Sequence, residues 1–308
     1  MHIHGIYYSD PVYRPPSEAG SLLIQVTEGC TYRCSFCFAN MKKFKVRKLA
    51  EIKKDMDTAR QVYGADVRKM FFLDGNAMVI PAVKLQELCN YAMKLFPRLN
   101  RIGTYAHAKD ILAKSDEELR SLHQAGLGIV YIGIESGNNQ QLAKAGKMVT
   151  ADEIVAAFHK CFLSGITPSG TIILGLTGKD NKLAEKHIID TADLVNRASP
   201  VHVIKGSKLP AWYISCLALM FPEGSDVARD ADNGTFIPQT PEGILHEMKL
   251  LIENISDDVK SCVFRSNHAS NYLPIKGRLS RDRDKILSVI NKSIEHPENV
   301  RPEFMRGL

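Results

Sequence analysis

Three cysteines lie close together near the start of the chain, at Cys30, Cys34 and Cys37. They follow residues 22–26, an apolar run that predicts a strand, so they should lie on the loop after it. Three thiolates on one loop can hold three corners of a cubane iron–sulfur cluster, and without a fourth cysteine nearby one iron is left for an outside ligand. An open iron indicates chemistry, whereas a fully ligated one indicates electron storage.

Zinc is the main alternative metal for such a loop. A structural zinc site needs a fourth cysteine or histidine at a companion spacing, and the nearest histidines, His4 and His107, belong to other segments. Three unrelated core cysteines are a further alternative, but core residues have no reason to gather on a loop led by glycine. The other cysteines are scattered and are expected to be buried thiols outside disulfides: Cys89, Cys161, Cys216 and Cys262.

Strand-like and helix-like runs alternate along most of the chain, and these elements must position the cysteine loop. Strands are expected at residues 22–26, 69–73, 101–105, 128–134, 169–174 and 201–204. Helices are expected between them, at residues 47–63, 81–96, 115–125, 138–163 and 181–197. Successive βα units favour parallel strands joined by right-handed crossovers. We therefore predict an α/β fold, a partial (β/α)6 TIM-type barrel with its chemistry at the carboxyl ends of the strands.

The alternation weakens after Lys205. An irregular stretch is followed by expected helices at 241–254 and 282–296, with a further strand at 259–264 between them. This part is too poor in regular structure to form a core by itself. The predicted divisions are an N-terminal extension, the partial barrel, and a C-terminal extension that closes the barrel and lines the substrate site: residues 1–20, 21–208 and 209–308.

Composition excludes several classes of protein. Of the 308 residues 44% are hydrophobic and 24% are charged, values typical of a globular protein and unlike those of a disordered or fibrous one. A net charge of +6 is compatible with an anionic substrate or with weak nucleic-acid contact, and requires neither. No apolar run approaches the roughly 20 residues that span a bilayer, and no secretory signal begins the chain. We expect a cytoplasmic protein without a membrane partner.

The cysteine segment resembles the motif of the radical S-adenosylmethionine (radical SAM) enzymes. That motif spaces the cysteines by three and then two residues, with an aromatic residue before the last, which is Phe36 here. The resemblance implies one [4Fe-4S] cluster, S-adenosylmethionine on its open iron, anaerobic chemistry and an external one-electron donor such as flavodoxin or ferredoxin. Reductive cleavage of S-adenosylmethionine would then give a 5′-deoxyadenosyl radical.

Strand-end segments extend this resemblance. Asp74, Gly75 and Asn76 follow the second strand, where the family usually carries Gly-Gly-Glu to bind the methionine amino group. The acidic side chain stands at a different step here, so Asp74 and Asn76 are both candidates for the amine. A tight turn is the alternative explanation for Asp-Gly-Asn.

The fourth strand ends in Gly-Ile-Glu-Ser-Gly, which looks like the family segment that approaches the ribose or the amino-acid end of the cofactor. Glu135 and Ser136 are the polar residues of this segment. Lys147, in the helical region that follows, is a candidate partner for the cofactor carboxylate, with a solvated surface position as the alternative. Three further residues complete the expected cofactor contacts: Thr104 for a hydroxyl, and Ile173 and Leu176 for adenine.

Substrate contacts are expected after the late strand, because loops at that edge reach the mouth of a barrel. The candidates are Arg265, Asn267 and Asn271 on this loop and Lys205 after the sixth expected strand. His268 and Tyr272 are the candidate catalytic residues, and packing with a bonded hydroxyl is the alternative for the tyrosine.

The cofactor segments look most like the branch with oxygen-independent coproporphyrinogen oxidase and the elongator-type catalytic subunit. The predicted reaction begins with hydrogen abstraction from an unidentified small organic substrate, for which an anionic compound is one option. Radical modification of RNA or protein is the alternative within enzymes. A non-catalytic iron–sulfur or zinc protein is the alternative outside them.

Overall fold

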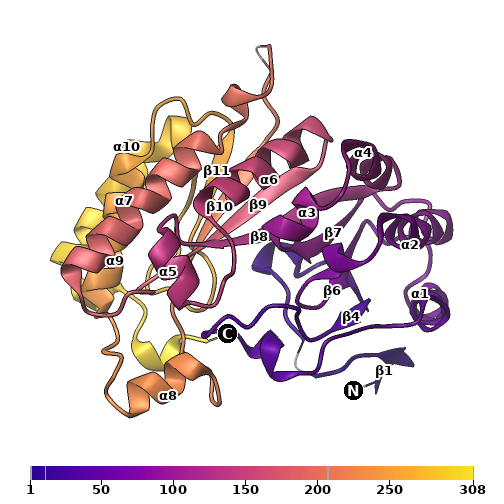
Figure 1. Cartoon of the computed structure of the whole chain (residues 1–308), viewed down its shortest axis with the longest axis horizontal. Helices are drawn as coiled ribbons and strands as arrows, with labels where there is room; N and C mark the ends of the chain where they lie inside the picture. Colours follow the sequence, from indigo (N-terminus) through magenta and orange to yellow (C-terminus); the bar gives the residue numbers. More distant parts are fainter. Residues whose placement is uncertain (1, 11, 207, 308) are drawn as a thin grey trace. The chain divides into compact units, whose positions relative to one another are not determined.

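The structure is a computed structural model that describes residues 2–10, 12–206 and 208–307. The chain forms two compact units that alternate along the sequence (Figure 1). The first unit consists of Met1–Tyr32, Ala39–Ile132 and Lys160–Pro168. The second consists of Arg33–Phe38, Gly133–His159 and Ser169–Leu308. The three sequence-based divisions remain predictions.

Parallel strands build the sheet of the first unit. Their order is β3 (Leu22–Gln25), β6 (Lys69–Leu73), β7 (Arg101–Ala106) and β8 (Leu127–Glu135), and β8 continues into the second unit at Gly133. The helices of this unit are α1 (Leu49–Tyr63), α2 (Ala82–Leu95), α3 (Ala108–Leu112) and α4 (Asp116–Gln124). Helix α2 packs between α1 and α4 (Figure 1).

The core of the first unit explains why these strands form. Strand β6 is buried from Met70 to Leu73, the pattern of a strand that is covered on both faces. The rings of Phe71, Tyr105 and Tyr131 meet edge to face across three neighbouring strands. These contacts pack side chains of β6, β7 and β8 against one another.

Three parallel strands and one antiparallel strand build the sheet of the second unit. Their order is β9 (Thr167–Leu174), β10 (Trp212–Ala218), β11 (Cys262–Arg265) and the antiparallel β12 (Lys276–Arg278). The helices are α5 (Asn139–Lys144), α6 (Ala151–Leu163), α7 (Asn181–Arg197), α8 (Asp226–Asp232), α9 (Pro241–Asn254) and α10 (Leu279–Glu295). From Lys160 onward α6 belongs to the first unit. Helix α9 packs between α7 and α10 (Figure 1).

Close packing in the second unit depends on a glycine in β9. A Cβ at Gly170 would lie 2.4 Å from the Cδ1 of Ile134 and 2.9 Å from the Cζ of Phe158. The ring of Phe158 in turn meets Trp212 edge to face. The absent side chain therefore allows large apolar residues to fill the core beneath the strand ends.

Short elements complete the fold. Two antiparallel pairs are present, β1 (His2–Ile3) with β2 (Ile6–Tyr7), and β4 (Thr27–Glu28) with β5 (Lys45–Val46). The 3-10 turns are Pro16–Glu18, Phe38–Met41, Ala77–Val79, Pro200–His202, Pro297–Asn299 and Glu303–Met305. None of the helices in the described ranges is long and apolar enough to cross a bilayer.

The expected strand at residues 201–204 is wrong. Pro200 begins a 3-10 turn there, because proline fixes its own φ and lacks the N–H that a ladder requires. The strand that follows β9 is β10, whose residues alternate between buried and half-buried. Lys205 is therefore exposed and precedes β10, and does not follow a strand end as expected.

The expected helix at residues 138–163 is interrupted. Helix α5 ends at Lys144, and two residues later Gly146 has a φ of 71°. Only glycine adopts this left-handed conformation without strain, so the position ends the helix. Helix α6 then begins at Ala151.

Candidate functional site

Backbone hydrogen bonds hold the second part of the cysteine loop. The N–H of Cys37 donates to the carbonyl of Cys34 at 3.1 Å, which closes a tight turn. Ser35 donates to Ala145 at 3.0 Å and accepts from Val227 at 3.1 Å. Cys34 is buried and Cys37 is half-buried. The turn is therefore tied to the segment after α5 and to the start of α8, all within the second unit.

Glycines line the loop at distances that exclude a side chain. In the second unit, a Cβ at Gly146 would lie 2.4 Å from the carbonyl oxygen of Arg33. In the first unit, a Cβ at Gly75 would lie 2.7 Å from both the Cβ of Cys30 and the carbonyl oxygen of Gly29. A side chain at either position would force the neighbouring backbone to move. The loop therefore rests directly on the main chain of its neighbours.

The donor atoms of the loop fit an iron–sulfur cluster. Thiolates are the soft ligands that such clusters use. Within the described ranges, no three histidine, cysteine, aspartate or glutamate side chains already stand together as a set of metal ligands. The fit therefore rests on the three thiols and on the glycines that leave room for the loop.

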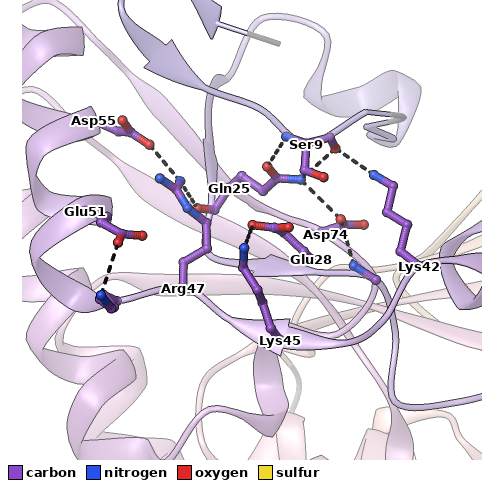
Figure 2. A network of polar contacts seen from close by, with 11 residues as sticks. Ser9, Gln25, Glu28, Lys42, Lys45, Arg47, Glu51, Asp55 and Asp74 are labelled. Atoms are coloured by element: carbon purple, nitrogen blue, oxygen red, sulfur yellow. Dashed lines mark hydrogen bonds and ion pairs between the residues drawn. The ribbon is translucent and has the colours of Figure 1, made fainter.

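Asp74 is bonded to the backbone that leads into Cys30 (Figure 2). Its Oδ2 accepts from the N–H of Gly29 and from the Nε2 of Gln25, both at 3.2 Å, and its Oδ1 accepts from Gly75 at 2.8 Å. Burial raises the pKa of the Asp74 carboxyl, and the hydrogen bond from Gly75 opposes this shift. Gln25 also exchanges hydrogen bonds with the backbone of Ser9. Asp74 thereby joins two strand ends and the approach to the first cysteine.

Asn76 joins the same loop from a different direction. Its Nδ2 donates to the Oδ2 of Asp110 at 2.6 Å and to the Oγ1 of Thr31 at 3.2 Å, and its Oδ1 accepts from the N–H of His107 at 3.3 Å. The ring of His107 stacks on Tyr32 at 3.5 Å between centroids. Sequence reasoning missed Asp110, which accepts a hydrogen bond from Asn76 and lies in no motif that the sequence singled out.

Thr104 lies fully buried within the first unit. Its hydroxyl donates to the carbonyl of Phe72 on the neighbouring strand at 3.0 Å. The bond links β7 to β6, so the hydroxyl proton is already in use. An acceptor lone pair is what the side chain retains for any cofactor contact.

Glu135 and Lys147 form a buried ion pair in the second unit. The Nζ of Lys147 lies 2.8 Å from the Oε1 of Glu135, and the two side chains are 8% and 9% exposed. Burial alone would lower the pKa of Lys147, but the charges of Glu135, Cys34 and Cys37 outweigh it and raise that pKa. The sequence predicts Lys147 as a partner of the cofactor carboxylate, and in the structure its charge interacts with Glu135 and with two of the cysteines.

Local geometry supports this pair. Glu135 has a φ of 59°, a left-handed conformation that costs a non-glycine residue energy. A Cβ at Gly133 would lie 1.9 Å from the Oε1 of Glu135 and 2.4 Å from the Nζ of Lys147. The glycine of the Gly-Ile-Glu-Ser-Gly segment therefore leaves the space that the ion pair fills.

His187 joins two of the expected cofactor segments. Its Nε2 lies 3.0 Å from the carbonyl oxygen of Ile173, and its Nδ1 lies 2.7 Å from the Oγ of Ser136. A carbonyl only accepts, so Nε2 carries the proton and Nδ1 accepts from Ser136. Burial lowers the pKa of His187 to about 4, which keeps the ring neutral. Sequence reasoning missed this histidine; the available signal was its place on the apolar face of α7.

An apolar cluster gathers three residues expected at the cofactor. Phe36 and Leu176 pack against a buried group that includes Ile173. The other members come from segments for which the sequence predicted no role: Leu219, Val227, Phe221 and Phe236. The cluster thus places the aromatic residue of the cysteine motif against the end of β9.

A buried carboxyl follows the same strand. The Oε2 of Glu247, on α9, accepts from the N–H of Gly175 at 2.6 Å. Burial raises the pKa of Glu247 to about 7, and the bond from Gly175 acts in the opposite direction. Sequence reasoning missed this residue as well. Glu247 holds the turn that carries Leu176.

Asn271 has an unpaired oxygen in the interior of the second unit. Its Nδ2 donates to the carbonyl of Cys216 at 2.7 Å, and this bond sets the orientation of the amide. The Oδ1 is buried and has no hydrogen-bond partner. An unsatisfied buried acceptor costs about 1–3 kcal/mol, so this oxygen is available to accept a hydrogen bond.

The other substrate candidates differ in their surroundings. The guanidinium of Arg265 stacks on the ring of Tyr213 at 4.7 Å, and Asn267 is exposed. The Nδ1 of His268 accepts from the N–H of Ser270 at 3.1 Å. Burial, and then the charge of Arg301, lower the pKa of His268.

Tyr272, the second catalytic candidate, is packed and bonded. Its hydroxyl donates to the Oε2 of Glu303 and accepts from the Nη1 of Arg306, each at 2.5 Å. The guanidinium of Arg306 also lies over the tyrosine ring at 4.3 Å. This arrangement is the alternative that the sequence left open, a buried ring with a bonded hydroxyl.

Comparison with known proteins identifies the family of this site. The model of the radical SAM superfamily matches residues 24–192. The 4′-phospho-dehydrooxetanocin synthase of Priestia megaterium is 25% identical over 165 residues, which are 48% of this chain and 22% of that protein. The chain therefore spans about a fifth of the length of this curated relative.

Solved structures show a similar fold. Methylornithine synthase (PylB) superposes with a TM-score of 0.51 at 14% identity, over 90% of this chain and 81% of that one. The radical S-adenosylmethionine methyltransferase TsrM from Kitasatospora setae, with cobalamin and a [4Fe-4S] cluster bound, gives a TM-score of 0.50 at 17% identity, over 72% of this chain and 41% of that one. The expected α/β fold, a partial TIM-type barrel, is confirmed.

Proposed function

Because the chain belongs to the radical SAM superfamily, we propose that Cys30, Cys34 and Cys37 ligate its cluster and that S-adenosylmethionine binds the open iron. The protein is an enzyme whose cofactors are a [4Fe-4S] cluster and S-adenosylmethionine. Bound together, these cofactors supply one-electron cleavage of the sulfonium and a carbon radical that abstracts hydrogen.

The observation that carries this proposal is a buried ion pair whose cation interacts electrostatically with the cysteine turn. Lys147 acts electrostatically on Cys34 and Cys37 and is itself held by Glu135 at 2.8 Å. A positive charge beside thiols favours their thiolate form, which is the form that binds iron. Lys147 and Glu135 are thus proposed to support the ligands and the polar part of the cofactor.

We assign different roles to the two candidates for the methionine amine. Both oxygens of Asp74 are already bonded to backbone N–H groups, one of them that of Gly29, so Asp74 is proposed to position the cysteine loop. Asn76 lies beside Asp110 and Thr31, the residue after Cys30. The carboxylate of Asp110 is the charge in this group that suits an ammonium.

The apolar cluster around Phe36 and Ile173 is proposed to receive adenine. Its residues are aromatic or aliphatic, as the flat apolar face of a nucleobase requires. His187 is hydrogen-bonded to both Ser136 and Ile173. It therefore fixes the Gly-Ile-Glu-Ser-Gly segment relative to strand β9. A neutral ring with both nitrogens bonded is suited to positioning and not to proton transfer.

The substrate is proposed to be a small organic molecule that carries an N–H or O–H donor. Support comes from Asn271, whose buried Oδ1 has no partner while its amide nitrogen is bonded to Cys216. A donor from the substrate would remove the cost of this unpaired oxygen. The reaction is proposed to begin with hydrogen abstraction from this molecule.

The test is reductive cleavage of S-adenosylmethionine. Protein reconstituted with iron and sulfide without oxygen, then given dithionite and S-adenosylmethionine, should form 5′-deoxyadenosine. Cys→Ala changes at Cys30, Cys34 or Cys37 should abolish both cluster absorbance and product. The matched controls Cys89→Ala and Cys161→Ala remove buried thiols and should retain the cluster. An intact cluster that yields no product would overturn the proposal.

A further inference from the structure

The chain segment after the cysteines is strongly basic. Between Glu28 and Glu51 there is no acidic residue, whereas six arginines and lysines are present, and four of them are Lys42, Lys43, Lys45 and Lys48. A segment with one sign of charge creates a local field that attracts a partner of the opposite sign. The segment from Ala39 onward lies within the first unit.

One of the basic residues is internal and anchors the segment. The Nη1 of Arg47 lies 2.7 Å from the Oδ2 of Asp55 and 2.8 Å from the carbonyl oxygen of Gln25, and the side chain is buried (Figure 2). The lysines on either side differ, because Lys43 is exposed and the side chains of Lys45 and Lys48 are 59% and 85% exposed. Arg47 therefore fixes a strand that presents its lysines to solvent.

Three lysines of this segment, Lys42, Lys43 and Lys45, border a concave surface. A hollow of about 640 Å³ is lined by Lys42, Lys43 and Lys45 and by two acidic residues, Asp10 and Glu28. Glu28 is paired with Lys45 at 2.8 Å (Figure 2). Three ammonium groups against two carboxylates leave the hollow with a net positive charge. Its shape and charge suit the convex, acidic surface of another protein.

The same segment contacts the start of the cysteine loop. A Cβ at Gly29 would lie 2.8 Å from the carbonyl oxygen of Lys42 and 3.3 Å from that of Ala39, so these backbones are packed together. Strands β4 and β5 pair Glu28 with Lys45. Gly29 precedes Cys30, the first proposed ligand. The backbone of the basic segment therefore packs against Gly29, the residue that precedes the loop that would hold the cluster.

We infer that this basic surface, formed by Lys42, Lys43, Lys45 and Lys48, is the docking site of an acidic electron-carrier protein. The inference rests on the proposed function, because the radical reaction needs an external reductant. The reduced carrier would lose one electron and so be oxidised by one equivalent, and the cluster that Cys30 would help to hold would gain that electron. Attraction between exposed charges brings the two proteins together, and salt weakens it.

Charge reversal tests the surface without changing the proposed cofactor contacts. The double variant K43E/K48E alters two exposed lysines of the surface. The matched control K84E/K94E makes the same change of net charge on α2, where both lysines are exposed. Each reconstituted protein is supplied with S-adenosylmethionine and either dithionite or enzymatically reduced flavodoxin, and 5′-deoxyadenosine is measured at low salt.

With dithionite all three proteins should form product at rates within twofold of one another. With flavodoxin the rate of K43E/K48E should fall at least tenfold, while K84E/K94E follows the unaltered protein, whose own rate should fall as salt is added. Equal losses with both reductants, or no loss with flavodoxin, would overturn the docking site. Absence of product from the unaltered protein with dithionite would instead overturn the proposed function.

Direct binding tests the surface independently of turnover. Oxidised flavodoxin and an acidic ferredoxin are titrated against the three proteins at low salt. A Kd that rises at least tenfold for K43E/K48E alone supports the inference with either carrier. An unchanged Kd, or no binding of either carrier to the unaltered protein, overturns it. Transfer RNA is the competing probe, and tighter binding of RNA that is lost in K43E/K48E would overturn it in favour of a nucleic-acid surface.

Discussion

Acid should destabilise the second unit through His187. Burial lowers the pKa of this histidine from 6.5 to about 4. Below pH 6.5 this histidine is protonated in the unfolded chain, whereas in the folded chain it stays neutral until the pH falls to about 4. The stabilisation is therefore complete above pH 6.5 and is lost as the pH falls toward 4. With about 1.4 kcal/mol for each pH unit, the loss at this residue reaches about 2.5 kcal/mol at pH 4.5.

Glu247 acts in the opposite direction over the same range. Burial raises its pKa from 4.5 to about 7, so the folded chain holds a proton that the unfolded chain has released, and stability rises as the pH falls toward 4.5. The pH profile of the unaltered protein therefore contains two opposing contributions. Only a difference between variants isolates the histidine.

His187→Gln provides this difference. The glutamine amide can donate to the carbonyl of Ile173 and accept from Ser136, but it does not titrate. Urea unfolding of the cluster-free protein at 25 °C is followed by the fluorescence of Trp212, the one tryptophan of the chain, which is buried in the same unit. Between pH 7 and pH 4.5 the free energy of unfolding should shift by about 2.5 kcal/mol in favour of the variant.

The control is His246→Gln, a change on α9 where the side chain is 55% exposed. Its free energy of unfolding should follow that of the unaltered protein at both pH values. If His187→Gln also keeps a constant difference from the unaltered protein, the histidine is not buried in its neutral form and the reasoning is refuted. A matched shift in the control would assign the effect to titration elsewhere.

Further predictions concern the ion pair and the glycines. Lys147→Met leaves the buried carboxylate of Glu135 without its cation and should cost about 3–5 kcal/mol in urea unfolding, whereas the double variant with Glu135→Gln should cost less. Gly170→Ala inserts a methyl group into packed side chains and should cost about 1–3 kcal/mol by the same measurement. Gly75→Ala places a methyl group 2.7 Å from the Cβ of Cys30, so iron bound after reconstitution should fall while the far-ultraviolet circular dichroism is retained; full iron content would contradict this.

Local patterns in the sequence were sufficient for most of the elements. Helix α7 begins and ends where expected, at Asn181 and Arg197, because Asp180 caps its first turn and an apolar face continues along its length. Strand β6 also has its expected bounds. The strand expected at 201–204 is wrong because Pro200 begins a 3-10 turn there, and a short apolar run alone does not distinguish a turn from a strand.

The candidate site likewise combines features that the sequence determines with contacts that it does not. The type and spacing of Cys30, Cys34 and Cys37 are properties of the sequence alone, and so is the match to the radical SAM family, because ligand chemistry depends on residue type and short-range spacing. The partners of Asp74 and His187 come from segments far away along the chain.

Only the tertiary structure decided that Asp74 bonds the backbone before Cys30, that His187 links Ser136 to Ile173, and that the oxygen of Asn271 lacks a partner. Each of these facts depends on which groups burial brings together and which donors it leaves over. Local residue patterns carry no record of such contacts, because packing of the whole chain determines them.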